Sequence, residues 1–153
     1  MKNRLLLKVD FLIQTRTSGN CGPCSVKMLL DYHQKFHPDG HPFTVQSINK
    51  HLRVSKKWGC EESDIENFLE RFEIGYTKVR FHQLESLLKQ KKPILSLYQD
   101  ELHDGHYGLL VGQDQDHYFF HDPWPDFGPY FRRQKKTFAK QAKVFNNWFL
   151  TLD

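Results

Sequence analysis

The chain has 153 residues, of which 39% are hydrophobic and 26% charged, a composition that fits one compact domain spanning residues 1–153. Its formal charge of +4 is only mildly basic, and we interpret the basic run "RRQKK" at residues 132–136 as a solvated face, so we expect no nucleic-acid partner. No stretch has the apolar core of a signal peptide or the length of a membrane span, and three unevenly spaced cysteines suit a reducing compartment. These observations predict a cytoplasmic protein without a membrane partner.

Helical patterns dominate the first half of the chain. The positions that mark one face of the first helix are Ser25, Met28, Leu29, Tyr32 and Phe36. The polar text "TSGN" precedes Cys21 and can cap this helix, and Pro23 stands in the first turn, where proline is tolerated. Cys21 is therefore expected at the helix N-terminus, and further helices are expected over residues 45–52, 62–72 and 82–90.

Strand patterns follow in the second half. Apolar and aromatic runs bounded by turn residues predict strands over residues 93–99, 106–113, 117–122 and 147–152. Helices followed by an antiparallel sheet indicate an α+β fold.

The sequence "CGPC" at residues 21–24 allows three interpretations. The first is a redox dithiol, because this motif at a helix N-terminus resembles the thioredoxin active site. Nine residues separate Phe11 from Cys21, however, which is longer than the strand-to-helix turn of that family. The second is a zinc site formed with His33 and His37, but on one continuous helix the cysteines and histidines would lie on opposite sides, so no metal site is expected.

The third interpretation makes one cysteine a nucleophile that needs a base and a group to orient that base. If residues 106–113 and 117–122 form a hairpin across "DQD", Gly108 faces Asp122, and Asp122 becomes a diagonal neighbour of His106 on the same sheet face. A two-residue loop would place the two side chains on opposite faces. Gly108 and Gly112 would leave room on that face for a helix that carries the nucleophile.

Three segments, in this order, resemble the C39-type, or bacteriocin-processing-like, cysteine peptidases of the papain-like superfamily. They are "QTRTSGNCGPCSVKMLLDYH", "DGHYGLLVG" and "YFFHDPWP", and together they cover about a third of the chain. The resemblance implies an α+β papain-like fold with Cys21 as nucleophile, His106 as general base and acid, and Asp122 as the residue that orients the imidazole. It also implies that Gln14 and the backbone N–H of Cys21 form the oxyanion hole.

Several residues near these segments have alternative roles. Six residues separate Gln14 from Cys21, so Asn20 or backbone amides are alternatives for the oxyanion. Trp124, just past Asp122, is a candidate for the wall of a substrate cleft, and we expect Asn20 and Trp124 to contact substrate. His103 is a rival base. We expect Cys24 and Cys60 to fill core space, and strand alternation turns His121 away from the site.

The sequence therefore predicts a cysteine peptidase that cleaves a polypeptide substrate through a thioester acyl-enzyme and needs no cofactor. Deamidation of glutamine or transfer to an amine would use the same acyl-enzyme and remains an alternative. Alternatives of another class are a thioredoxin-like oxidoreductase and an inactive peptide-binding domain. The resemblance implies cleavage after a double glycine in leader peptides, but these 153 residues contain no transporter, so a different polypeptide is also considered.

Overall fold

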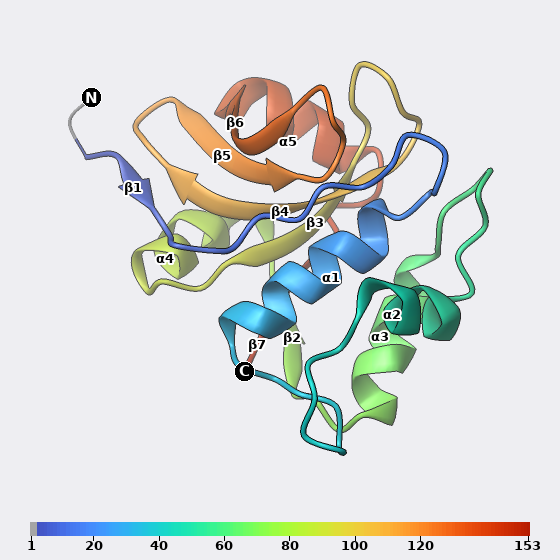
Figure 1. Cartoon of the computed structure of the whole chain (residues 1–153). Coiled ribbons are helices and arrows are strands. Elements are labelled where there is room, and N and C mark those ends of the chain that lie inside the picture. Colours follow the sequence, from blue (N-terminus) through green and yellow to red (C-terminus); the bar gives the residue numbers. More distant parts are fainter. Residues whose placement is uncertain (1–2) are drawn as a thin grey trace.

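The computed structural model describes residues 3–153 as helices packed on a sheet in which every strand pair is antiparallel (Figure 1). The order of strands is β2-β7-β3-β4-β5-β6, and β1 pairs with part of β4. The seven strands of the described residues are β1 (Leu5–Leu6), β2 (Tyr76–Lys78), β3 (Ile94–Tyr98), β4 (His106–Gln113), β5 (His117–Asp122), β6 (Gly128–Gln134) and β7 (Phe149–Leu152).

Helices cover both faces of this sheet. They are α1 (Cys21–Tyr32), α2 (Val45–Leu52), α3 (Glu62–Arg71), α4 (Leu84–Lys89) and α5 (Lys135–Lys143), with a 3-10 turn, η1 (Phe81–Gln83), before α4. On one face α1 lies against β4. Helix α2 packs against α1 and also contacts α3. On the other face lies α5 (Figure 1), and its Phe138 packs against the rings of Tyr98 and Phe120. Within residues 3–153, no helix is both long and apolar enough to cross a membrane.

The expected helix over residues 45–52 and the strands over 106–113 and 117–122 match the structure. The first helix is shorter than its apolar pattern suggests, because α1 ends at Tyr32, Gln34 adopts a φ of 53°, and Phe36 pairs with Pro42 in a turn. The interpretation of "RRQKK" as a solvated face is wrong for Arg133, which is buried where these residues pass from β6 into α5.

The β4–β5 hairpin has the predicted register near His106 and Asp122, although its turn is not the predicted one. Asp114 N–H donates to the His117 carbonyl, so the turn is tighter than the expected "DQD" loop, and by itself it would put His106 and Asp122 on opposite faces. A β-bulge at Val111 adds one residue and reverses this parity. Beyond the bulge Leu109 pairs with His121, which is the predicted register.

The space beside Gly108 is filled by a side chain of β3 rather than by a helix. A Cβ at this position would collide with the Tyr98 hydroxyl and lie 3.2 Å from two of its ring carbons. The expectation that the nucleophile's helix approaches over Gly108 is therefore wrong, since α1 packs on the opposite face, where Gly22 lies against Tyr107. Glycine at 108 instead allows the Tyr98 ring of β3 to lie over β4 and reach Asp122 on β5.

We predict that Gly108→Ala destabilises the protein by about 1–3 kcal/mol in urea unfolding, because the added methyl group must displace a buried ring. The same substitution in a Tyr98→Leu background should cost much less, since leucine does not reach the clashing position. An equal cost in both backgrounds would mean that contact with Tyr98 is not the reason for the glycine.

Candidate active site

Cys21 is the first residue of α1, and its position depends on an N-terminus that lacks a side-chain cap. Asn20 occupies the cap position, and its carbonyl accepts the N–H of Cys24 at 3.0 Å. Its side chain makes no hydrogen bond to the helix and instead accepts one from the Asn49 amide of α2. The first-turn N–H groups and the positive end of the helix dipole are therefore left for another acceptor beside the Cys21 sulfur.

His106 connects Cys21 to a buried carboxylate. Its Nε2 lies 2.6 Å from Oδ1 of Asp122, and the two side chains are 1% and 0% exposed. Cys21 lies near enough to the same ring to contribute to its raised pKa. Burial alone would disfavour the charged imidazole, but the charge of Cys21 and the hydrogen bonds to Asp122 and Cys21 outweigh it and raise the pKa of His106 to about 10. The imidazole thus holds its proton at neutral pH.

Asp122 is held by more than its histidine. The Tyr98 hydroxyl donates to Oδ2 at 2.7 Å, and the backbone N–H of Trp124 donates to Oδ1 at 3.0 Å. Burial raises the pKa of Asp122, but the hydrogen bonds and charge of His106, together with those from Tyr98 and Trp124, lower it below its ordinary value. The carboxylate therefore stays ionised although it is fully buried.

Arg133 supplies the positive charge behind this carboxylate, a role that no sequence pattern indicated. Its Nη2 lies 3.7 Å from Oδ2 of Asp122, and its Nη1 donates to Glu101 at 3.1 Å. The guanidinium lies over the rings of Tyr98, Phe127 and Phe131 at 4.9–5.1 Å from their centroids. Alternation along β6 turns Arg133 inward while Arg132 stays exposed, so strand assignment was the missing information.

A second histidine–aspartate pair stands directly beside His106. The Asp100 carboxylate accepts the backbone N–H groups of Leu102 and His103 and lies 2.9 Å from Nδ1 of His103. The His103 ring stacks on His106, with 4.6 Å between centroids and 16° between planes. The expectation of His103 as a rival base placed it correctly near the site, whereas Asp100 was missed.

Potential metal ligands come together only at this stack within residues 3–153. Donor atoms of Asp100, His103 and His106 lie within 4.8 Å of one another. The two imidazole planes are nearly parallel, so the lone pairs of their nitrogens do not point at a common centre. Oδ1 of Asp100 already accepts two backbone N–H groups, and Oδ2 lies 2.9 Å from Nδ1 of His103. The alternative of a zinc site at the cysteines with His33 and His37 is not supported, since those donors do not gather.

Gln14 and Trp124 lie close to Asp122 and His103, respectively. Gln14 is buried, and its backbone N–H donates to the Pro123 carbonyl at 2.9 Å, which places it beside the residue that follows Asp122. Trp124 is half-buried, with its ring edge against His103 and the Arg16 guanidinium 5.4 Å over its face. His121 points to the other face, as expected, and its Nε2 lies 2.6 Å from the Val9 carbonyl oxygen.

The other two thiols lie near Cys21 but differ from it in environment. Cys24 is 2% exposed, and burial, with the charge of Cys21, raises its pKa to about 12. Burial also raises the pKa of the half-buried Cys60, whose sulfur lies against Gly22. A redox dithiol requires an accessible, acidic pair and usually a parallel βαβ unit, whereas every strand pair of the described residues is antiparallel.

The sequence and the fold both have known relatives. The model of the Peptidase_C39 like family matches residues 6–148. The chain belongs to this family. No curated protein sequence matches it. Its membership supports a peptidase function.

Solved structures of C39 peptidases share the papain-like fold with this C39-like chain. A putative C39-like peptidase from Bacillus anthracis is 12% identical with a TM-score of 0.80, over 99% of this chain and 98% of its own. The peptidase domain of Streptococcus ComA, a bifunctional ABC transporter, is 14% identical with a TM-score of 0.75, over 95% and 98%. A double glycine motif protease solved with its leader peptide is 18% identical with a TM-score of 0.68, over 98% and 94%.

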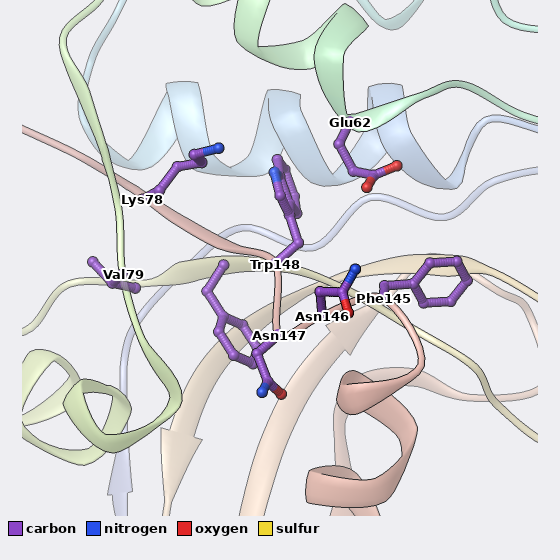
Figure 2. Close-up of a pocket in the computed structure, with 8 residues that line it drawn as sticks. Glu62, Lys78, Val79, Phe145, Asn146, Asn147 and Trp148 are labelled. Carbon is purple, nitrogen blue, oxygen red and sulfur yellow. The ribbon is translucent and has the colours of Figure 1, made fainter.

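Figure 2 shows a cavity of about 310 Å³, which none of the candidate site residues lines. Its lining residues are Glu62, Lys78, Val79, Phe145, Asn146, Asn147, Trp148 and Phe149. Two of them contact the neighbours of His106: a Cβ at Gly105 would lie 2.9 Å from the Phe145 ring, and the Trp148 ring meets Tyr107 at 5.9 Å. Two residues of the cavity wall thus contact the residues before and after His106 in the sequence.

Asp122→Asn should lower the pKa of His106 by about one pH unit or more, because it removes the negative charge that stabilises the imidazolium. Histidine NMR titration measures this directly. In the wild type His106 should stay protonated as the pH rises until about pH 10, and in the variant it should lose its proton at a lower pH. Identical titrations in the two proteins would contradict the assigned role of Asp122.

Proposed function

We propose that this protein is a cysteine peptidase, one domain over residues 1–153, in which Cys21, His106 and Asp122 form the catalytic triad. The observation that carries the proposal is the placement of one imidazole between a thiol at a helix N-terminus and a buried carboxylate 2.6 Å away. All three cysteines are free, which suits a cytoplasmic location.

In the first half of the reaction, the Cys21 thiolate attacks the carbonyl carbon of a peptide bond. The oxyanion that develops accepts the Cys21 backbone N–H at the uncapped helix end, with the Gln14 amide as second donor. His106 then transfers its proton to the leaving nitrogen, the carbon–nitrogen bond breaks, and a thioester remains on Cys21. His106 is protonated at the start of this step because the pKa of its imidazole is raised.

In the second half, His106 accepts a proton from water, which attacks the thioester and releases the carboxylic acid and the Cys21 thiolate. Asp122 keeps Nε2 engaged throughout, so the other ring nitrogen stays directed at the sulfur and the substrate. Attack by an amine in place of water would make the same enzyme a transferase. A glutamine side chain in place of the peptide bond would make it a deamidase.

We propose a polypeptide substrate, and one structural neighbour, a double glycine motif protease in complex with its leader peptide, supports this class. The cavity beyond Tyr107 offers space for substrate residues on one side of the scissile bond. We expect Trp124 and Asn20 to contact the substrate as well.

Alkylation of the native protein with limiting iodoacetamide tests the triad. Cys21 should react fastest, and His106→Ala should reduce its rate about a hundredfold at pH 6, since a thiol without an imidazolium partner is mostly protonated there. Mass spectrometry of digested protein locates the label and gives the rate at each cysteine.

Cys24→Ala is the matched control, because it removes a neighbouring thiol and leaves the triad intact. It should keep both the rapid labelling and the cleavage of a peptide library, whereas Cys21→Ala should abolish cleavage. Equal reactivity of Cys21 and Cys24, or reversible formation of a disulfide between them with reductase activity, would favour the oxidoreductase alternative.

Glu62, the first residue of α3, lines the cavity and allows its role in substrate binding to be tested (Figure 2). Glu62→Gln should lower kcat/KM roughly two- to fivefold for library peptides with a basic residue near the scissile bond, because one charge pair is lost. Neutral peptides and the alkylation rate should not change. No effect on any peptide would place the substrate elsewhere, and an equal loss for all peptides would mean that the charge of Glu62 does not select basic residues.

A further inference from the structure

The ring of His106 is enclosed by two other rings. The Tyr98 ring meets it edge-on, with 5.8 Å between centroids and 80° between planes. On another side His103 stacks almost flat on it at 4.6 Å and 16°. The triad uses the nitrogens of His106 but does not explain what fixes the plane of its ring.

One hydrogen bond does not fix that plane. The contact between Nε2 and Asp122 leaves the imidazole free to tilt about the bond, and a tilt of the ring would swing its other nitrogen away from Cys21. A flat partner on the ring face opposes such a tilt. His103 is suited to this role because its own ring is held on both sides, by Asp100 at Nδ1 and by the Trp124 ring at 4.6 Å.

The charges around the stack agree with this role. His106 is protonated at neutral pH, so a second imidazole beside it would oppose the triad if it added positive charge. The Asp100 side chain, which is 0% exposed, lies 2.9 Å from Nδ1 of His103 and so places a carboxylate beside the second imidazole. The stack therefore supports the ring without repelling the imidazolium.

We propose that His103, fixed by Asp100, is a positioning residue that holds the His106 ring in the plane in which it meets both Asp122 and Cys21. This inference rests on the proposed function, because it assigns a task within the same triad. His103 itself has no contact with the reacting atoms in this role.

The chain contains a matched control for His103. Asp114 and His117 repeat the same arrangement at the other end of β4: the Asp114 carboxylate accepts the His117 backbone N–H at 2.8 Å and lies 3.2 Å from its Nδ1. That pair has the same spacing of three residues and a similar half-buried histidine, but it stands in the β4–β5 turn, away from the triad.

The test measures iodoacetamide alkylation of Cys21 in the intact protein between pH 5 and pH 9, for the wild type, His103→Ala, His103→Phe and His117→Ala. His103→Ala should slow alkylation about tenfold at pH 6 and flatten its pH dependence, because misplacing a reacting group by a fraction of an ångström is costly. His103→Phe retains a flat ring and should remain within about threefold of the wild type. His117→Ala should match the wild type.

Two outcomes would overturn the positioning role: His103→Ala with a wild-type pH profile, or His103→Phe as slow as His103→Ala. If His103→Ala does not fold, as judged by circular dichroism, His103→Phe decides the question alone, and alkylation about tenfold slower than in the wild type would overturn the role. A wild-type Cys21 no more reactive than a free cysteine would instead refute the proposed triad. In that case the ring nitrogen NMR signals of His106 still test the inference, which requires them to change in His103→Ala and not in His117→Ala.

Discussion

The buried contact between His106 and Asp122 is the constraint around which this structure is organised. Two groups that carry opposite charges lie 2.6 Å apart with almost no exposure, and removing such charges from water costs more than their attraction returns unless further polar partners are present. Those partners come from three strands: Tyr98 from β3, the Trp124 N–H just past β5, and Arg133 from β6.

Much of the surrounding packing follows from this requirement. Gly108 lacks a side chain so that the Tyr98 ring can cross the sheet, and three aromatic rings enclose the Arg133 guanidinium where water is excluded. The bulge at Val111 brings His106 and Asp122 to the same face after a turn that would separate them. Each feature is local, but its reason is the buried pair.

The parts of the site that could be predicted from the sequence are those set by short-range geometry. Helix signals placed Cys21 at an N-terminus, and strand parity placed His106 with Asp122, although the bulge that makes this parity correct has no sequence signature. Tyr98 and Arg133 were missed because their contacts with Asp122 join different strands, and nothing in a single strand pattern shows which partner lies across the sheet.

The same distinction explains the "CGPC" motif. The two cysteines share a helix turn, yet Cys21 is placed at the open helix end beside His106, whereas Cys24 is in the core with a raised pKa. The spacing in the sequence does not distinguish the two cysteines, whereas the position of His106 beside Cys21 does. Because Asn20 turns its side chain to Asn49, the helix end that would otherwise be capped remains open on the side of Cys21. In the proposed mechanism the helix therefore supplies both the thiol and an N–H group for the oxyanion, whereas Cys24 packs in the core.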